Sequence, residues 1–418
     1  MKVAIINKSD STGGAAIVSF RLTEALRNSG TDARMVVAEK LTHASFVDLA
    51  GSEAAMKIPF LTERLGIFLR NGLNRDTLFK IDTASAGMPL HRHPDVKSAD
   101  VVCLNWVNQG LLSLREIGKI LKMGKPVVWT MHDMWNFTGI CHHAGECPGY
   151  LGDCSDCPLL VPKLAFKGLA SKTMKRKSKL YGMEPKIHFV AVSNWLAHRA
   201  RESKLIGSGM PLSVIPNAFP FPDKPRERKL KGEGERLRLL FGAARLDDPV
   251  KDLPALVETT RILKERYPEL AGRLELVTFG AVKNPEALEG FAIPATHMGM
   301  IHGAEKIREL YEGADILVST SRYETLPGTL VEAQAYGCVP VSTDRGGQRD
   351  IIDHLSTGYL ARDPEGLAEG IAWAAARISG PDGDAGIFAR MLKEARFRFS
   401  AEAVAARYLS LFRSMLKG

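Results

Sequence analysis

The sequence predicts an α/β protein made of two doubly wound, Rossmann-like domains, on the strength of three observations. In the first half of the 418-residue chain, short apolar runs alternate with amphipathic helical patterns, which is typical of a parallel sheet covered by helices. A second alternation of the same kind begins near residue 236. Between them, residues 219–235 are dense in proline and charge, which predicts a linker between domains.

The first domain is expected over residues 1–218. Its strands are predicted at 2–7, 33–38, 101–105, 127–130 and 189–192, and an amphipathic helix at 15–29 is closed by Gly30. Between residues 41 and 100 the pattern is less regular, which indicates an insertion containing a helix around 61–73.

The second domain is expected over residues 236–400. Its strands are predicted at 237–242, 274–279, 316–319 and 339–342, with helices at 253–266 and 307–312. The last segment, 401–418, has the pattern of an amphipathic helix, and we expect it to cross back to the N-terminal domain.

Composition narrows the class of protein. Hydrophobic residues make up 45% and charged residues 25% of the chain, as in ordinary globular proteins. The sequence contains no run of 18 apolar residues, so no membrane span is predicted. The N-terminus resembles a strand rather than a signal peptide, so a cytoplasmic protein is expected. The net charge of +9 fits a well-solvated surface, attraction to phosphate-bearing substrates, or attraction to an anionic membrane leaflet. Nucleic acid is not expected as a partner, because aromatic residues make up only 7% of the chain and no nucleic-acid-binding motif is present.

A turn rich in proline and glycine follows the predicted strand at 316–319. It contains Glu324, then Thr325 as an N-cap and Pro327 in the first turn of a helix. Gly337 suits the C-cap of that helix, and Pro340 cannot continue it.

A second carboxylate, Glu332, lies within the same predicted helix. At about 1.5 Å rise per residue it stands roughly 7–8 Å beyond Pro327. A diphosphate at the helix N-terminus would meet free N–H groups and leave one carboxylate on each side. One carboxylate can bind a ribose diol and the other a sugar's hydroxyls, which suits a nucleotide-sugar. The alternative is two solvated carboxylates, although the helix dipole does not explain Glu332.

Further polar residues follow other predicted strands. Arg245 and Lys251 suit a diphosphate leaving group, since fixed cations stabilise its developing charge; the alternative is two surface cations. Gly13 and Gly14 follow the first strand and open a helix. They form either a loop that binds phosphate or a plain tight turn. His132 follows the strand at 127–130. It either positions the sugar or acceptor, or it is a structural histidine held by hydrogen bonds.

These motifs resemble a known family. Ser321-x-x-Glu324-x7-Glu332-Ala-x-Ala-x-Gly337 is similar to the signature of family 4 retaining glycosyltransferases, which have the GT-B fold of two Rossmann-like domains facing across a cleft. Gly242-Ala-Ala-Arg245 with Lys251 is similar to that family's phosphate-binding pair, and the resemblance covers most of the chain.

The resemblance implies roles for individual residues. It implies His132, Arg245, Lys251 and Glu324 as catalytic residues, with His132 bordering the sugar and the acceptor. It implies a larger set of donor-binding residues, namely Gly13, Gly14, Thr325, Leu326, Pro327, Gly328, Thr329 and Glu332. No divalent cation is required for catalysis in that family.

Two positions depart from the family pattern. Asp252 stands where glycine usually follows the lysine, and Thr325-Leu-Pro327 stands where Gly-Phe-Gly is common. Both changes adjust the sugar pocket without removing a charged group.

The resemblance also implies an activity. It is the retaining transfer of a sugar from a nucleotide-sugar to a lipid-linked or oligosaccharide acceptor in the synthesis of a cell-surface polysaccharide, with attack on the front face. The segment from His132 to Pro158 is similar to a subgroup that includes colanic-acid-type transferases. The alternatives are a GT-B nucleotide-sugar epimerase and a non-catalytic, zinc-stabilised scaffold at the membrane.

Four of the six cysteines fall within residues 141–158, and they are Cys141, Cys147, Cys154 and Cys157. Cys154-x2-Cys157 is the usual spacing of half a structural zinc site, whereas the other half is longer than usual. Free thiols and disulfides are the two alternatives, and a reducing cytoplasm disfavours disulfides.

A basic, amphipathic stretch runs over residues 163–186. Its cations are Lys163, Lys167, Lys172, Lys175, Arg176, Lys177, Lys179 and Lys186, and the apolar residues between them are Leu164, Phe166, Leu169, Met174 and Leu180. This pattern suits docking on the anionic inner face of the plasma membrane, where lipid-linked acceptors reside, or alternatively a solvated helix face.

Overall fold

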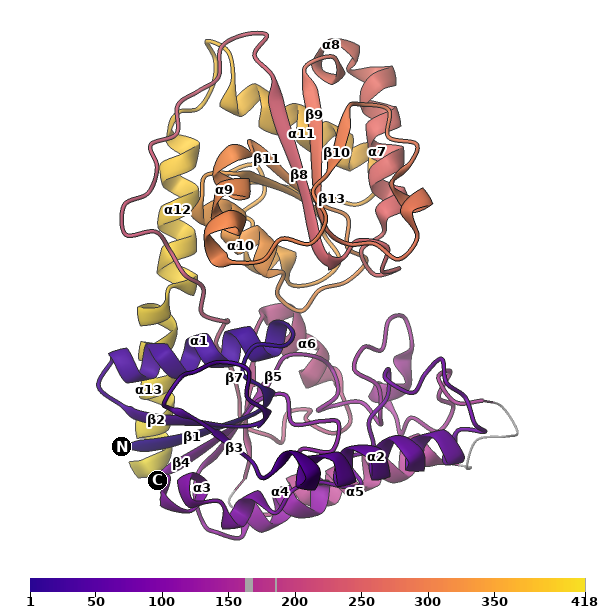
Figure 1. Ribbon diagram of the computed structural model, residues 1–418, viewed down its shortest axis with the longest axis vertical. Coiled ribbons are helices and arrows are strands. Elements are labelled where there is room, and N and C mark those ends of the chain that lie inside the picture. Colours follow the sequence, from indigo (N-terminus) through magenta and orange to yellow (C-terminus); the bar gives the residue numbers. More distant parts are fainter. Residues whose placement is uncertain (162–167, 185, 418) are drawn as a thin grey trace. The chain divides into compact units, whose positions relative to one another are not determined.

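The computed structural model describes residues 1–161, 168–184 and 186–417. Lys163, Leu164, Phe166 and Lys167 of the predicted basic stretch lie outside the described residues. The chain divides into two compact units, the first of residues 1–218 with 401–418 and the second of residues 219–400 (Figure 1).

Unit 1 is a seven-stranded parallel sheet with helices on its faces. Its strands are β1 (Lys2–Ser9), β2 (Asp32–Glu39), β3 (Val47–Leu49), β4 (Val101–Leu104), β5 (Val127–Met131), β6 (His188–Ala191) and β7 (Leu212–Val214). They lie in the order β3-β2-β1-β4-β5-β6-β7. The order reverses between β1 and β4, which is where doubly wound sheets bind their ligands.

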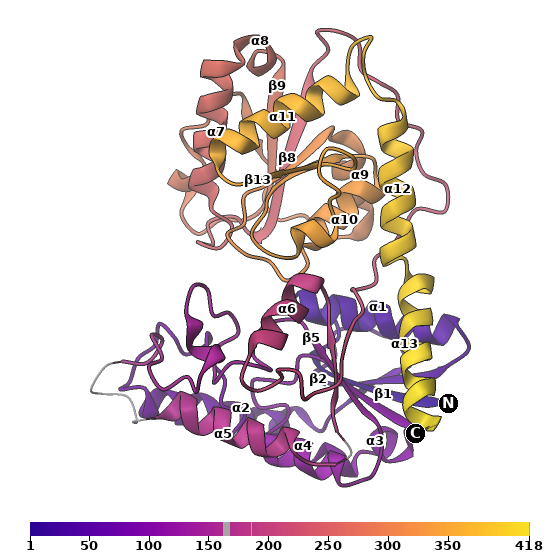
Figure 2. The ribbon, with the colours of Figure 1, turned by 180° about the vertical axis from the view of Figure 1, so that it is seen from behind.

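The helices of unit 1 include the chain's C-terminal segment. They are α1 (Gly14–Asn28), α2 (Glu53–Arg70), α3 (Pro94–Ser98), α4 (Leu114–Leu121), α5 (Leu169–Tyr181), α6 (Asn194–Glu202) and α13 (Ala401–Lys417). Helix α13 lies beside α1 (Figures 1 and 2) and buries Val404, Tyr408 and Phe412 in the core of unit 1. The Tyr408 hydroxyl contacts Thr130 Oγ1 of β5 at 2.8 Å.

Unit 2 is a six-stranded parallel sheet of the same winding. Its strands are β8 (Leu237–Arg245), β9 (Leu274–Ala281), β10 (Ala295–His297), β11 (Ile316–Ser319), β12 (Val339–Thr343) and β13 (Tyr359–Ala361), in the order β10-β9-β8-β11-β12-β13. Its helices are α7 (Leu253–Arg266), α8 (Pro268–Ala271), α9 (Ala304–Gly313), α10 (Gly328–Ala335), α11 (Pro364–Ile378) and α12 (Gly386–Phe399). The order reverses between β8 and β11.

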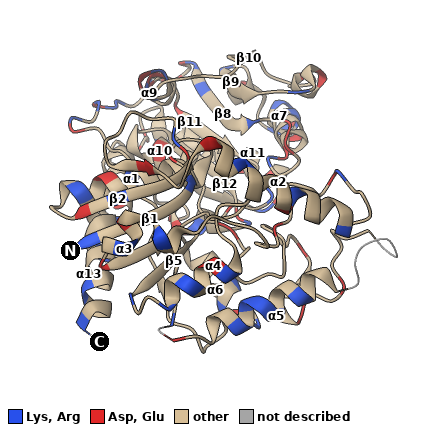
Figure 3. Ribbon diagram, turned by 60° about the horizontal axis from the view of Figure 1, so that its bottom comes forward, with Lys and Arg blue, Asp and Glu red and all other residues tan. Residues whose placement is uncertain are grey.

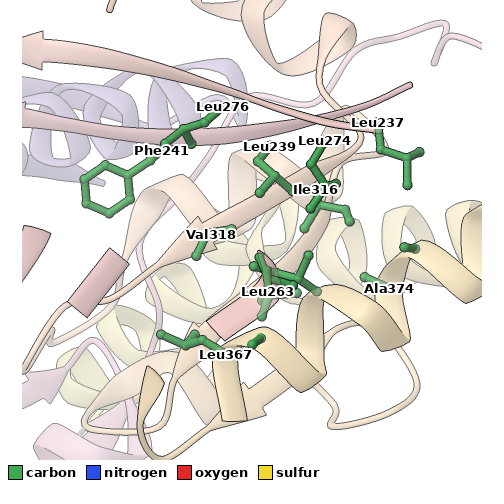
Figure 4. Packing of buried hydrophobic residues seen from close by; sticks show 14 of the residues in the cluster. Leu237, Leu239, Phe241, Leu263, Leu274, Leu276, Ile316, Val318, Leu367 and Ala374 are labelled. Atoms are coloured by element: carbon green, nitrogen blue, oxygen red, sulfur yellow. The ribbon is translucent and has the colours of Figure 1, made fainter. Parts of the chain in front are cut away.

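The core of unit 2 forms where the apolar strands face helices α7 and α11. Leu239, Leu276 and Val318 of the strands pack with Leu263 of α7 and Leu367 of α11 (Figure 4). The central strands are buried apolar runs and one face of each helix is apolar, so their side chains fill the space between the sheet and the two helices.

Two segments differ from the sequence-based expectations. Helix α2 begins at Glu53, well before the expected start at 61, because Ser52 caps it by accepting the Ala55 N–H at 3.3 Å. The predicted linker 219–235 lies along unit 2, where the Arg228 guanidinium donates to backbone carbonyls of Glu312, Ala314 and Gly337.

Candidate functional site

The reversal point of the unit 2 sheet gathers the charged residues that the sequence singled out. Arg245 is the last residue of β8, and Lys251 lies in the loop between β8 and α7. Glu324 lies in the loop between the neighbouring strand β11 and α10. Both loops leave the carboxyl ends of adjacent strands, so residues about 70 positions apart in the sequence meet at one edge.

Lys251 and Glu324 form an ion pair at this edge. The Lys251 ammonium contacts Glu324 Oε1, which also accepts a hydrogen bond from Ser321 Oγ at 3.3 Å. Their side chains are 28% and 23% exposed, so a ligand can reach both charges. The two loops are also joined by hydrogen bonds, since the Arg322 N–H donates to the Val250 carbonyl at 2.8 Å and Thr320 Oγ1 donates to the Lys251 carbonyl at 2.6 Å.

Asp252, one of the departures from the family pattern, adopts a left-handed conformation with φ of 52° just before α7. Glycine adopts this conformation without steric cost, which explains why glycine suits the position. Here the Arg322 guanidinium donates to both Asp252 oxygens at 3.0 and 3.2 Å. The substitution therefore adds a second ion pair between the same two loops.

Arg245 is paired locally instead. Its guanidinium lies 3.4 Å from Asp247 Oδ1 and 3.3 Å from Asp248 Oδ2, and its side chain is 37% exposed. The structure thus joins Lys251 with Glu324 and pairs Arg245 with the two aspartates that follow it. A phosphate would compete with these aspartates for the guanidinium.

Helix α10 begins at Gly328, with Pro327 at the N-cap and no capping side chain. The expectation that Thr325 caps the helix is wrong, because the chain becomes helical only after Pro327. An uncapped start leaves the N–H groups of the first turn available to an anion. Leu326 and Pro327 are buried, whereas Thr325, Gly328 and Thr329 are partly exposed.

Glu332 lies in the second turn of α10, and a tyrosine orients its carboxylate. The Tyr311 hydroxyl of α9 donates to Glu332 Oε2 at 3.2 Å. Burial and the nearby carboxylate raise the pKa of Tyr311 well above its usual value, so the hydroxyl stays a donor. Sequence reasoning missed Tyr311, since nothing in the pattern links two helices on either side of a strand.

Unit 1 has a separate pocket of about 400 Å³ at its own reversal point, lined by Gly13, Gly14, Trp106, His132 and Asp133 among others. Gly13 has φ of 89°, and α1 starts directly after it without a capping side chain. A Cβ atom added at Gly13 or Gly14 would meet no atom within 4 Å, so space for a ligand lies above this loop.

His132 is neutral in this pocket. Its Nε2 lies 2.9 Å from Asn105 Oδ1, so the ring donates a hydrogen bond there. Burial lowers the pKa of His132 to about 4, against the opposing effect of Asp133. A neutral, anchored imidazole fits positioning of a substrate better than transfer of a proton near neutral pH.

A buried charge network supports the wall of this pocket. His142 lies between two carboxylates, with Nδ1 2.7 Å from Asp133 Oδ2 and Nε2 2.6 Å from Asp82 Oδ2. Burial favours the neutral ring, but the two carboxylates hold the pKa of His142 at about 10. Asp133 also accepts from Trp106 Nε1 at 2.9 Å, and Asp82 is paired with Arg64 of α2.

The four clustered cysteines line one cavity of about 70 Å³ and form no disulfide. Gly149 N–H donates to Cys147 Sγ at 3.4 Å, and Gly139 N–H donates to Cys154 Sγ at 3.3 Å. Burial raises the pKa of Cys141 to about 12. Within the described part of the chain, no three His, Cys, Asp or Glu side chains are already arranged as metal ligands, and the zinc site stays a prediction.

Comparisons with known proteins identify what this arrangement resembles. Residues 237–377 match the family model "Glycosyl transferases group 1". The chain is 24% identical over 450 residues to the putative colanic acid biosynthesis glycosyl transferase WcaC of Escherichia coli K12, covering 99% of this chain and all of that protein. It is 29% identical over 206 residues to the amylovoran biosynthesis glycosyltransferase AmsK of Erwinia amylovora, covering 44% and 47% of the two chains.

Among solved structures, Anabaena Alr3699/HepE in complex with UDP superposes with a TM-score of 0.60 at 14% identity, over 99% of this chain and all of that one. At this identity the likeness shows the fold, and the fold is that of the GT-B glycosyltransferases.

Proposed function

We propose that this chain, a GT-B glycosyltransferase of the family 4 type, transfers a sugar from a nucleotide-sugar donor to a growing polysaccharide with retention of anomeric configuration. The observation that carries the proposal is the Lys251–Glu324 pair beside the uncapped start of α10. Such a pair presents a cation to a phosphate and a carboxylate to a hydroxyl within one site. The relatives WcaC and AmsK, named for colanic acid and amylovoran synthesis, support a polysaccharide as the product.

The donor would bind with its diphosphate at the start of α10. Its negative oxygens would accept from the N–H groups of the first turn, while Lys251 and Arg245 supply positive charge. Glu332, oriented by Tyr311, would accept from the ribose hydroxyls. HepE, which has the same fold, was solved with UDP, and this supports a nucleoside diphosphate as the leaving group.

The chemical step needs stabilisation of the departing diphosphate. Lys251 would leave Glu324 for a phosphate oxygen, and the released carboxylate would accept from hydroxyls of the donor sugar. Cations and N–H groups that are fixed before the reaction lower the barrier more than mobile solvent does. These groups supply the charge that a divalent cation provides elsewhere, so the proposal needs no metal for catalysis.

The unit 1 pocket would take part in binding the sugar or its acceptor. His132 presents a neutral ring held by Asn105, and the Gly13–Gly14 loop offers the N–H groups of α1. Both features position polar groups without adding charge. We propose a lipid-linked or oligosaccharide acceptor at the anionic inner membrane leaflet. No helix in the described ranges is long and apolar enough to cross a membrane.

The cysteine cavity is proposed as a structural zinc site that stabilises the loop 141–158. Zinc would bind the four thiolates and release their protons, and the thiols would have to rotate toward the cavity. The backbone N–H groups that already donate to Cys147 and Cys154 would remain as partners of the charged sulfurs.

The activity is tested by mixing purified protein with a panel of UDP- and GDP-sugars and a lipid extract from cells that make a surface polysaccharide. We expect one nucleoside diphosphate released per sugar transferred, and NMR should find the donor's anomeric configuration kept in the product. Conversion of the donor without an acceptor would favour the epimerase. Binding of zinc without binding of any nucleotide would favour the scaffold.

A further inference from the structure

Helix α2 departs from an ordinary amphipathic helix, because a row of large apolar residues is exposed while two charged residues are buried beside Met56, Pro59 and Ile67 on the inner face. Ile58, Leu61, Leu65 and Leu69 are 68%, 60%, 57% and 59% exposed, while Glu63 and Arg64 are buried. The four exposed residues are spaced three, four and four apart, so they form one row along the helix. A row of this kind is unusual on a surface that meets only water.

The buried charges fix the orientation of α2. Glu63 Oε2 accepts from the Gly110 N–H at 2.8 Å, and Glu63 Oε1 accepts from the Thr83 N–H at 3.2 Å. Arg64 is paired with Asp82, which also contacts His142. Rotating the helix to hide the leucines would take Arg64 away from buried Asp82 and Glu63 away from the N–H groups of Gly110 and Thr83, and losing the partner of a buried charge is costly. The apolar row is therefore held outward by the fold.

Two more exposed apolar residues follow the helix in the sequence. Leu73 and Phe79 are 58% and 59% exposed. We call these six residues (Ile58, Leu61, Leu65, Leu69, Leu73 and Phe79) the apolar row. Exposed cations accompany them, namely Lys57, Arg70, Arg75 and Lys80, against two exposed acids, Glu53 and Asp76.

Helix α5 adds more positive charge next to α2. The two helices share a small core in which Ile67 of α2 and Ala170 of α5 pack with Ile81 and Ile140. They run along the same edge of unit 1 (Figures 1 and 2), and α5 carries several cations (Figure 3). Those exposed to solvent are Lys172, Lys175, Arg176 and Lys179, and α5 contains no acidic residue.

We propose that the apolar row inserts into the surface of an anionic lipid bilayer, with the cations of α5 contacting the lipid headgroups. The charge around the apolar row favours a lipid surface over a second copy of the chain. A second copy would bring like charges together, whereas acidic headgroups attract the cations around the row. With polar partners along its inner side, α2 lies flat in the interface rather than crossing it. The inference rests on the proposed function only for its purpose, which is access to a lipid-linked acceptor.

The test is co-sedimentation of the full chain with vesicles of phosphatidylcholine, with and without phosphatidylglycerol. We expect wild type to bind the anionic vesicles and to dissociate as salt is raised. Leu61→Ser/Leu65→Ser should reduce the partition coefficient roughly tenfold or more, and Lys175→Ser/Lys179→Ser by a similar factor at low salt. The matched controls Phe397→Ser and Lys264→Ser/Lys306→Ser change exposed residues of unit 2 and should bind like wild type.

Three results would overturn the proposal. They are failure of wild type to bind anionic vesicles, binding of the leucine variant as tightly as wild type, and conversion of a wild-type dimer to a monomer by the leucine substitutions. Circular dichroism verifies that each variant is folded. Measuring hydrolysis of the donor in the absence of lipid distinguishes failure of the membrane-binding proposal from failure of the proposed transferase activity. That reaction should be equal in wild type and the leucine variant, and its absence from both would count against the transferase alone.

Discussion

His142→Gln is the substitution whose effect the structure defines most fully. The imidazolium is 12% exposed and lies between Asp82 and Asp133, whose side chains are 0% and 11% exposed. Glutamine keeps one donor but loses the charge, so two buried carboxylates remain close together with less compensation. Removing one partner of a buried ion pair costs about 3–5 kcal/mol, so we expect a loss of that size in the free energy of unfolding near pH 6.5.

The loss should depend on pH in a defined direction. The pKa of His142 is about 10 when folded and about 6.5 when unfolded, so the folded state binds the extra proton between these values. This raised pKa gives stability that is complete below pH 6.5 and disappears as pH rises through about 10, at about 1.4 kcal/mol per pH unit. The penalty of the substitution should therefore fall to about 1 kcal/mol at pH 9.

Other charged groups around His142 require a difference measurement. Asp82, Asp133 and Arg64 touch it or its partners, and Glu63, His143 and Lys177 lie nearby. Burial lowers the pKa of Lys177 to about 7, so its contribution rises with pH where that of His142 falls. Lys177 is present in both proteins, and subtracting the two free energies leaves the effect of His142.

The assay is urea unfolding followed by tryptophan fluorescence at pH 6.5, 8 and 9. Four of the five tryptophans (Trp106, Trp129, Trp135 and Trp195) lie in unit 1, so the signal reports mainly on the unit that contains the network. His198→Gln, at a solvent-exposed histidine of α6, is the matched control and should stay within about 0.5 kcal/mol of wild type. A penalty for His142→Gln that is constant from pH 6.5 to 9 would refute the reasoning.

Three further predictions address the ligand sites. Tyr311→Phe should weaken binding of the donor nucleotide about 5- to 10-fold by calorimetry, with Tyr267→Phe as control; unchanged affinity would show that Tyr311 does not orient Glu332. Gly13→Ala should lower unit 1 stability by about 1–2 kcal/mol because φ is 89°, whereas Gly14→Ala should not; equal effects in thermal melts would contradict the strained turn. Mass spectrometry should find about one zinc per chain, lost in Cys154→Ser/Cys157→Ser, and a metal-free wild type would exclude the zinc site.

The doubly wound fold is predictable from the sequence because buried parallel strands are short apolar runs. The runs at 2–7, 127–130 and 316–319 correspond to β1, β5 and β11. The position of the Glu324 motif was predictable for the same reason, because the loop that contains Glu324 directly follows a strand that the sequence predicts. GT-B structural neighbours confirm the fold class.

What the sequence could not show depends on contacts between distant residues. The sequence predicted a helix in this insertion but not which of its faces is buried. The partners of Glu63 and Arg64 at Gly110, Thr83 and Asp82 decide that orientation. The two contacts of His142 likewise join it to Asp133, 9 positions away, and to Asp82, 60 positions away. Periodicity reports which residues share a face and does not report what that face meets.

The central claim is that Lys251 and Glu324 act on the donor of a glycosyl transfer. Its most direct test is the rate of nucleoside diphosphate release by Lys251→Ala and Glu324→Ala at saturating donor. We predict that each rate falls by about 100-fold or more. The matched variants Lys264→Ala and Glu265→Ala, at exposed positions of α7, should keep the wild-type rate. Rates for Lys251→Ala and Glu324→Ala within twofold of wild type would contradict the account.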